Sequence, residues 1–314
     1  MCYHPTMVSF VVSTDQVKAF SRTLLRWYRK FGRDLPWRHT QDPYHILVAE
    51  VMLQQTQVTT VIERYQRWFK RFPTIAALAK AESAAVLKEW SGLGYNRRAL
   101  ALQQIAQRVM TEFRGKFPAD IATLKSFNGI GDYTAHALAS FAFQQRVPLV
   151  DTNIKRVLGR IFFGYKKLEK IRDDHEQFWE LSRKVIDRTS SPYDLNQGLM
   201  DFGAIVCTAK QPRCHVCPMQ TICRSYPAIL QAQPERLRVK TKRHEPLYYG
   251  QPRRIWRGKI LQYLHTQPKG ATLQAMGRHL QADWQDNRLE WLDSVIRTMI
   301  KDQLIQTKGN RFQV

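Results

Sequence analysis

The chain has 314 residues, of which 49 are Lys or Arg and 26 are Asp or Glu, giving a formal net charge of +23. With 44% hydrophobic residues it can bury a sizeable core, and its length predicts about two domains. This composition excludes a disordered chain, and the lack of eighteen consecutive apolar residues excludes a predicted membrane span. Such a charge favours a polyanionic partner, most commonly nucleic acid, although a general solubility role stays open.

The first residues carry a short apolar run, but they have neither a basic leader nor a small-residue cleavage site. We therefore expect an intracellular protein, in the cytoplasm or nucleoid, with no membrane partner. A reducing compartment of this kind disfavours disulfides.

Apolar residues recur at helical spacing through most of the first 225 residues, and no alternating strand pattern of useful length appears there. Glycine or proline residues separate these helical segments. They cover about residues 14–31, 43–55, 58–72, 95–113, 131–143, 151–163, 173–188 and 193–206. The pattern predicts an all-α domain over residues 1–226.

A Gly-x-Gly turn at residues 129–131 separates two helical segments. Glycines let the backbone pass close to a phosphate, and the following helix N-terminus offers free N–H groups and a positive dipole end. We expect the phosphate contacts at Gly129, Gly131, Tyr133 and Thr134, which would grip one strand without reading its sequence. A plain turn between helices is the alternative, which the basic chain and an acidic residue twenty positions on, Asp151, disfavour.

Four cysteines lie within residues 207–223 with the spacing C-x6-C-x2-C-x5-C. They are Cys207, Cys214, Cys217 and Cys223. Four thiolates brought together in this way can hold a tetrahedral metal or one cubic iron–sulfur cluster, and the spacing differs from the usual zinc pattern of two C-x2-C pairs. Structural zinc remains an alternative.

The composition changes after the cysteines. Residues 227–254 contain four prolines and the basic run RLRVKTKRH, which predict an extended linker. Helical spacing returns within residues 255–314, and Gly309-Asn310 suits a hairpin turn close to the end. Three helices and a terminal hairpin resemble a winged helix, for which DNA binding, protein contact and simple stabilisation all remain open.

Several of these segments together resemble a known superfamily. The turn at 129–131, residues 148–153 and the cysteine loop resemble the helix-hairpin-helix DNA glycosylases, which include endonuclease III. Segments 35–38, 50–58 and 92–95 are similar to the adenine DNA glycosylases within it, and the resemblance covers about residues 14–226. It implies two helical lobes, a [4Fe-4S] cluster on the four cysteines, and, as partner, double-stranded DNA containing a mismatch or an oxidised base. We expect a monomer.

Breaking an N-glycosidic bond requires one proton donor and one lasting negative charge beside an oxocarbenium-like sugar. Glu50 lies among apolar residues of a predicted helix, where burial disfavours the charged carboxylate, so we expect it to be the acid for adenine N7. Asp151 lies at a predicted helix start, where the dipole favours its anion, so we expect it to stabilise or trap the sugar cation. A carboxylate at a helix start is often only an N-cap, which the resemblance disfavours here.

The resemblance also assigns residues to the base that must leave the duplex. It places Gln55 and Tyr95 as wedges at the lesion and Leu93 near the opposite base. The pocket for the extruded adenine would be lined by Trp37, Arg38, Leu53, Tyr133, Asn153 and Gln197. For Trp37 and Tyr95, a role in the core is the alternative.

Superfamily members that also cut the backbone carry a Lys where this chain has Tyr133, so we expect a monofunctional enzyme that leaves an abasic site. Thymine glycosylases of T:G or U:G mismatches also resemble the core but lack the run at residues 53–57. A non-catalytic iron–sulfur DNA-binding protein is a third hypothesis, which the pair of carboxylates disfavours.

The resemblance fails in two places. Adenine enzymes usually carry a C-terminal domain that checks for 8-oxoguanine, and we expect a different, winged-helix-like domain in residues 255–314. Thr152 also stands between the catalytic aspartate and Asn153, where those enzymes normally have Gly. Recognition of 8-oxoguanine is therefore the least certain expectation.

Overall fold

The computed structural model describes residues 12–171, 174–231, 247–280 and 289–314. The chain divides into two compact units. The cysteine unit comprises residues 12–35 and 135–231, and the hairpin unit comprises residues 36–134 and 247–314. The linker prediction for residues 232–246 lies outside the described residues. Along the described part of the chain, no helix is long and apolar enough to cross a membrane.

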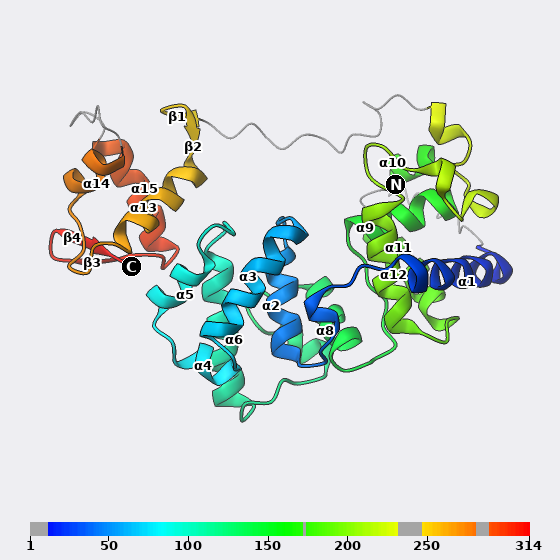
Figure 1. The fold of residues 1–314 in the computed structure, drawn as a ribbon, viewed down its shortest axis with the longest axis horizontal. Helices are drawn as coiled ribbons and strands as arrows, with labels where there is room; N and C mark the ends of the chain where they lie inside the picture. Colours follow the sequence, from blue (N-terminus) through cyan, green and yellow to red (C-terminus); the bar gives the residue numbers. More distant parts are fainter. Residues whose placement is uncertain (1–11, 172–173, 232–246, 281–288) are drawn as a thin grey trace, which may run out of the picture. The chain divides into compact units, whose positions relative to one another are not determined.

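The cysteine unit is helical (Figure 1). Its helices are α1 (Thr14–Phe31), α9 (Thr152–Leu158), α10 (Tyr165–Ile171), α11 (His175–Asp187) and α12 (Pro192–Ile205), together with most of α8 (Asp132–Phe141). A π-helical turn at Gly159–Phe163 continues α9, and short 3-10 turns lie at Cys214–Val216, Gln220–Ile222 and Ala228–Gln231. The long helix α1 begins at residue 14 because Ser13 accepts a hydrogen bond from the Gln16 N–H at 3.1 Å.

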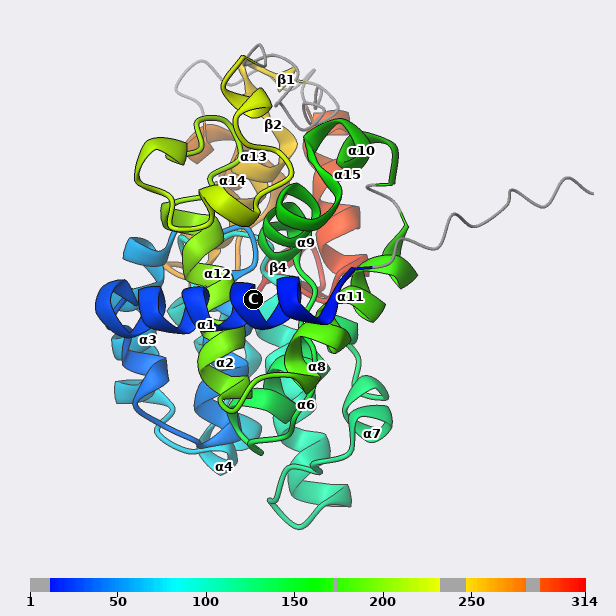
Figure 2. The same cartoon turned by 90° about the vertical axis from the view of Figure 1, so that its right-hand side faces the viewer.

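Helix α1 crosses α12, and this crossing forms the core of the cysteine unit (Figure 2). Trp27 packs edge-on against Phe202 with ring centroids 5.1 Å apart, and Phe20 packs against Phe162 at 5.3 Å. Arg33, just beyond α1, forms an ion pair with the fully buried Asp201 at 2.7 Å. Its main-chain N–H also donates to Asp201 at 2.8 Å, so the buried carboxylate is both paired and hydrogen-bonded.

In the hairpin unit, residues 36–134 form a helical lobe. Its elements are a 3-10 turn (Pro36–Arg38), α2 (Pro43–Leu53), α3 (Val58–Arg71), α4 (Ile75–Lys80), α5 (Ser83–Trp90), α6 (Arg97–Glu112) and α7 (Ile121–Lys125). Trp68 and Trp90 are fully buried with ring centroids 5.6 Å apart. The Trp68 indole N–H donates to Tyr44 O–H at 3.0 Å, which donates to Phe72 O at 2.9 Å. The all-helical prediction for this part of the chain is confirmed.

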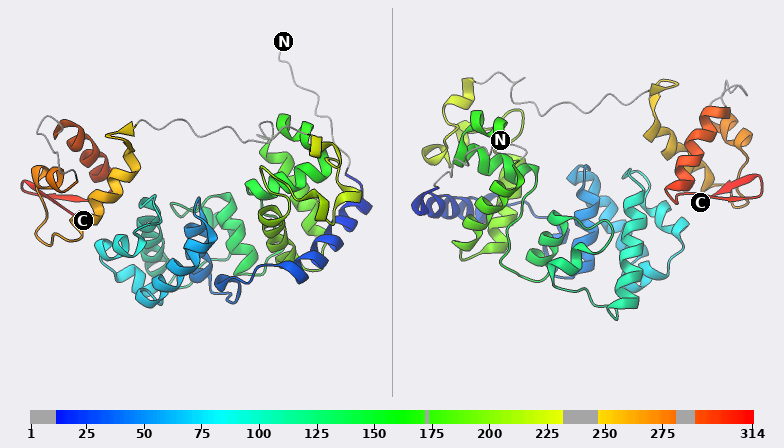
Figure 3. Two further views of the ribbon diagram at one scale, coloured as in Figure 1. Left: turned by 45° about the horizontal axis from the view of Figure 1, so that its top comes forward. Right: turned by 180° about the vertical axis from the view of Figure 1, so that it is seen from behind.

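Among its described residues, the tail of the hairpin unit has three helices and two short hairpins (Figure 3). The elements are β1 (Leu247–Tyr248), β2 (Gln251–Pro252), α13 (Arg253–Leu264), α14 (Leu273–Leu280), α15 (Leu289–Lys301), β3 (Gln306–Lys308) and β4 (Arg311–Gln313). Strands β3 and β4 are antiparallel around Gly309, where the hairpin was expected. Residues Trp256, Ile260, Leu292 and Met299 are among its buried core. The β1–β2 hairpin lies within the segment predicted to be linker.

Candidate active site and cysteine loop

Glu50 lies in the last two turns of α2, a helix that is buried on nearly all sides. Eight of its eleven residues are buried, and Leu47, Val48 and Val51 next to Glu50 are each at most 4% exposed. Asp42 caps the helix by accepting from the Tyr44 N–H at 2.8 Å. Glu50 itself is 5% exposed, so its carboxyl group is placed in the apolar surroundings that the sequence predicted.

Three of the predicted pocket residues, Trp37, Arg38 and Leu53, lie near Glu50 in the sequence and in the same unit. Trp37 is 7% exposed and meets Tyr65 of α3 edge-on, with ring centroids 5.5 Å apart. Arg38 follows it in the same 3-10 turn and is half-buried, as is Leu53 at the end of α2. The ring contact of Trp37 belongs to the lobe core, so its core role and a pocket role are compatible.

Both predicted wedge residues have left-handed backbone conformations. Gln55 has φ = 58° and Tyr95 has φ = 48°, which are uncommon for residues other than glycine. Both side chains are exposed, Tyr95 at 57%. Leu93, expected near the opposite base, is 6% exposed in this loop. Strained backbone of this kind persists only where the surrounding structure holds it, and it concentrates at functional sites.

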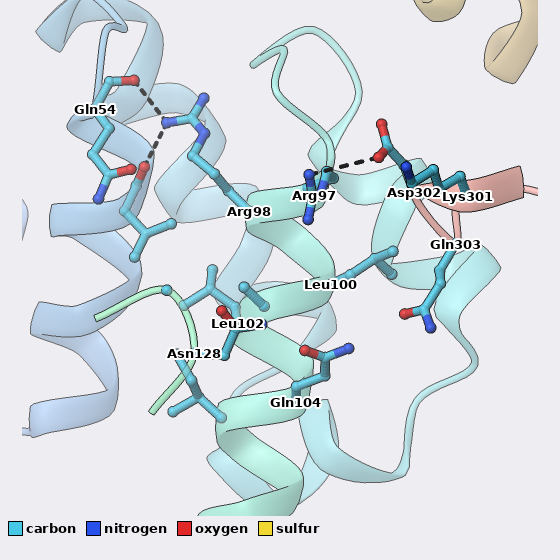
Figure 4. A pocket seen from close by; sticks show the side chains of 14 residues that line it. Gln54, Arg97, Arg98, Leu100, Leu102, Gln104, Asn128, Lys301, Asp302 and Gln303 are labelled. Carbon is cyan, nitrogen blue, oxygen red and sulfur yellow. Dashed lines mark hydrogen bonds and ion pairs between the residues drawn. The ribbon is translucent and has the colours of Figure 1, made fainter. Parts of the chain in front are cut away.

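Arg98 supplies that support for both wedge segments, a role that no local sequence pattern indicated. Its guanidinium donates to Val51 O at 2.6 Å and Gln54 O at 2.7 Å at the end of α2 (Figure 4). It also donates to Leu93 O at 3.1 Å and Gly94 O at 3.2 Å in the loop that precedes α6. One side chain therefore fixes the segments that carry Gln55 and Tyr95.

The Gly-x-Gly turn joins α7 to α8 as predicted. Gly129 has φ = 96°, and a Cβ there would lie 3.1 Å from the Ala101 Cβ, so the turn needs glycine. Gly131 is exposed, and a Cβ there would meet nothing within 4 Å. Thr134 is 4% exposed and Tyr133 is half-buried, so the two glycines are the more accessible positions for a phosphate.

Asp151 is the N-cap of α9 in the cysteine unit. Its carboxylate accepts the Ile154 N–H at 2.6 Å and the Asn153 side-chain amide at 3.0 Å. Burial raises the pKa of Asp151, while these hydrogen bonds and the nearby charge of Arg156 act in the opposite direction. The net direction is upward, against what the helix dipole alone predicts.

Arg156 connects this capping residue to the cysteine loop. Its Nη2 donates to Asn153 Oδ1 and to Gly203 O, both at 2.8 Å, and its Nε donates to Cys207 O at 2.8 Å. Helix α12 approaches closely here, because a Cβ on Gly203 would lie 2.8 Å from the Asn153 Cβ. The predicted pocket residue Gln197 lies earlier on α12 and is 4% exposed.

The cysteine loop closes against the π-helical turn that follows α9. The buried Arg160 donates to Thr208 O at 2.7 Å and Ala209 O at 3.0 Å, and its Nη1 lies 3.6 Å from Cys207 Sγ. At the other end of the loop, Ser225 Oγ donates to Arg160 O at 2.7 Å. Arg160 therefore holds both ends of the loop while placing a positive charge beside the first thiol.

The four thiols line one cavity and form no disulfide. Within the described ranges, no set of three His, Cys, Asp or Glu side chains is arranged to hold a single metal ion. The shared cavity is what a common ligand set of four thiolates requires.

The predicted site residues thus fall into two sets. The hairpin unit carries the acid, both wedges and the Gly-x-Gly turn, and the cysteine unit carries Asp151, Asn153, Gln197 and the four thiols. Sequence patterns missed Arg98, Arg156 and Arg160, each of which donates to a main-chain carbonyl group 47 to 51 residues away along the chain. The signal that could have found them is their position in the sequence. Arg98 lies close to Tyr95, and Arg156 and Arg160 lie close to Asp151.

Comparison with known proteins identifies the family of the chain. Residues 48–183 match the HhH-GPD superfamily of base excision DNA repair proteins, and residues 207–223 match the iron-sulfur binding domain of endonuclease III. The second match shows that the chain binds an iron–sulfur cluster, and its limits are those of the segment from Cys207 to Cys223. An adenine DNA glycosylase of Mycolicibacterium smegmatis is 37% identical over 92% of this chain and 94% of its own length.

The adenine DNA glycosylase of Rattus norvegicus is 41% identical over 69% of this chain but only 43% of its own length. The chain thus spans less than half of the mammalian relative that it matches. Among solved structures, a thermostable thymine-DNA glycosylase is similar, with a TM-score of 0.63 and 32% identity over 68% of this chain and 97% of that one. The fold is therefore that of this superfamily.

Proposed function

This chain belongs to the adenine DNA glycosylases of the HhH-GPD superfamily, and we propose that it excises adenine mispaired with guanine or 8-oxoguanine in duplex DNA. The observation that carries the proposal is the 37% identity to the mycobacterial adenine enzyme over 92% of this chain. The product would be free adenine and an abasic site, an early intermediate of base excision repair.

Glu50 is the proton donor in this proposal. Adenine leaves as a neutral base when N7 takes a proton and the electron pair of the C1′–N9 bond passes to N9, leaving an oxocarbenium ion on the sugar. A carboxylic acid held in apolar surroundings keeps its proton near neutral pH. The 5% exposure of Glu50 within α2 supports this role.

Asp151 supplies the negative charge beside the sugar cation, or forms a transient bond to C1′ that water later replaces. Water attacks C1′ and loses its proton, which balances the proton given to the base. The two hydrogen bonds from Ile154 and Asn153 fix the carboxylate for this task. Arg156 orients Asn153 through its hydrogen bond to Asn153 Oδ1. The iron–sulfur cluster would stabilise the cysteine loop, which Arg156 and Arg160 contact at Cys207.

Gln55 and Tyr95 would fill the space left by the extruded base, since both are exposed on left-handed backbone. Gly129 and Gly131 would hold a phosphate. Tyr133 stands where members that cut the DNA backbone carry a lysine, so the chain would be monofunctional and leave the backbone intact. Borohydride trapping of an enzyme–DNA crosslink at the rate of base excision would contradict this.

Excision of thymine from T:G mismatches is the second candidate function. The 32% identity to the thermostable thymine-DNA glycosylase favours it. The higher identity to adenine enzymes and the run at residues 53–57 favour adenine.

Single-turnover excision on duplexes with A:8-oxoguanine, A:G, T:G and U:G pairs separates these possibilities. We expect release of adenine only, and loss of release in Glu50→Gln and Asp151→Asn. Release of thymine without adenine would establish the second candidate instead. Tight binding with no release from any duplex would show a DNA-binding protein without glycosylase activity.

A further inference from the structure

A segment without regular secondary structure, residues 146–150, leads from the loop after α8 to Asp151 at the start of α9. We call it the approach segment. Within it, Pro148, Leu149 and Val150 are buried, Leu149 completely. Strands of the described part of the chain lie only in the tail, so no neighbouring strand supplies donors to the main-chain carbonyl groups of this segment. Buried carbonyl groups need hydrogen-bond donors, so other groups must provide them.

Buried side chains of two helices provide these donors. Ser182 Oγ of α11 donates to Leu149 O at 2.9 Å, and Asn196 Nδ2 of α12 donates to Val147 O at 3.0 Å. Both donor residues have 0% exposure. Hydrogen bonds inside a protein are electrostatically stronger than those in water. The main chain is therefore fixed at two carbonyl groups, the second of them only two residues before Asp151.

Further hydrogen bonds hold the chain on either side of these two points. Arg146 Nη1 donates to Ile186 O at 2.8 Å and to Thr189 O at 2.7 Å, so the start of the approach segment is attached to the end of α11. Beyond the segment, Asp151 itself accepts the Ile154 N–H at 2.6 Å. The position of the Asp151 carboxylate thus depends on the attachments before it as well as on the cap of α9 that follows it.

The two ends of the Asn196 amide are bonded differently. Its Nδ2 also donates to Ser140 Oγ at 3.0 Å, whereas its Oδ1 is buried and accepts no hydrogen bond from the described residues. A buried polar atom without a partner destabilises the fold. Because the Val147 carbonyl group can only accept, a reversed amide would place two acceptors against each other. The donor end of Asn196, which holds the approach segment, therefore accounts for an amide at this position in the core.

We propose that Ser182 and Asn196 are positioning residues, which hold the approach segment so that Asp151 stands where excision requires its carboxylate. The inference rests on the proposed function, in which Asp151 faces the sugar cation. Neither side chain reaches the substrate, because both are fully buried and act through main-chain carbonyl groups. Displacing a group of the site by about 1 Å can slow a reaction by about 10²-fold, so a small movement of this segment matters for the rate.

The first test compares two buried serines. Ser182→Ala removes the hydrogen bond to Leu149 O. Ser140→Ala is the matched control, because the Ser140 residue is 1% exposed and its hydroxyl bonds to Asn196 instead of the approach segment. Each variant loses one buried hydroxyl, so both should keep the fold with a similar, small decrease in melting temperature. Single-turnover release of adenine should slow by about tenfold in Ser182→Ala and stay near the wild-type rate in Ser140→Ala.

Affinity and rate together separate a positioning role from a general loosening of the fold. DNA affinity should be unchanged in Ser182→Ala, measured on a duplex carrying 2′-fluoro-2′-deoxyadenosine, which resists hydrolysis because fluorine destabilises the sugar cation. Asn196→Ala should slow release by a similar factor. Ser182→Ala added to Asp151→Asn should cause no further loss, because Ser182 acts only through Asp151. Equal release rates in Ser182→Ala and Ser140→Ala would overturn the proposal, and so would a wild-type rate in Asn196→Ala or a further loss in the double variant.

A second test needs no excision. The Ile154 N–H donates to the Asp151 carboxylate, so its amide hydrogen exchange reports whether that carboxylate stays in place. Ser182→Ala should speed the exchange at Ile154, and Ser140→Ala should leave it unchanged. An unchanged exchange rate in Ser182→Ala would contradict the positioning role. Failure of the wild type to release adenine would overturn the proposed function separately, because the exchange is measured without DNA.

Discussion

Glu50 and Asp151 are both shielded carboxylic acids, but the groups around them differ in kind. Glu50 lies on a helix whose neighbouring side chains are apolar, with Leu47 and Val48 at most 1% exposed. Asp151 accepts two hydrogen bonds and lies near the charge of Arg156. Apolar surroundings disfavour a charged carboxylate, whereas hydrogen-bond donors and a nearby positive charge oppose that effect. The two surroundings therefore differ in the way that the proposed acid and the proposed stabiliser of the sugar cation require.

The largest effect should come from removing either carboxyl group. Glu50→Gln keeps size and burial but cannot donate a carboxyl proton, so adenine release should fall by about 10²–10⁴-fold. Asp151→Asn should cause a loss of similar size. Single-turnover rates measure both, and melting temperatures check the fold. If Asp151→Asn kept the wild-type rate, Asp151 would be only the N-cap of α9.

Arg98→Ala should have the next largest effect. It removes donors to four carbonyl groups, each loss being worth about 1–3 kcal/mol where the acceptor stays buried. We expect weaker DNA binding and a lower melting temperature, with Arg98→Lys intermediate because an ammonium cannot span both segments. Arg71→Ala, which removes an exposed arginine at the end of α3, is the matched control. Equal DNA affinity in Arg98→Ala would show that the wedge segments hold their shape without the guanidinium.

Arg156→Ala tests the connection between Asp151 and the cysteine loop. The variant loses the hydrogen bonds to Asn153, Gly203 and Cys207. We expect adenine release to slow by about tenfold, because the Asp151 carboxylate would be displaced but still present. Visible absorbance of the iron–sulfur cluster reports whether the loop is intact. A normal rate combined with a lost cluster would show that the loop and Asp151 are independent.

The smallest effect should be a shift in pH dependence. Asp151 must be ionised to act, and burial raises its pKa, so activity is lost as pH falls through that raised value. Asn153→Ala removes a hydrogen bond that favours the anion, so the pKa should rise further and the acidic limb of the rate profile should move to higher pH. Thr152→Ala, an exposed neighbour, should leave the limb in place. If the acidic limb of the Asn153→Ala profile moved to lower pH, the limb would report the titration of a group other than Asp151.

The helices agree closely with the predicted segments wherever apolar residues recur at helical spacing over several turns. The segments predicted at 14–31 and 193–206 are α1 and α12, which differ from their predicted limits by at most one residue. The short helices α4, α5 and α10 were not predicted, because six to eight residues give too few turns for a period to show. Their stability comes from packing in the fold.

The sequence by itself determined which residues are candidates for the chemistry of this protein. The residue types at Glu50, Asp151 and the four cysteines, with their spacing, predicted an acid, an anion and a metal or iron–sulfur site, because local helix pattern and ligand spacing are encoded by neighbours along the chain. The tertiary structure decided what supports them. Arg98 and Arg160 bond to carbonyl groups 47 and 48 residues away, and helix packing alone brings such pairs together.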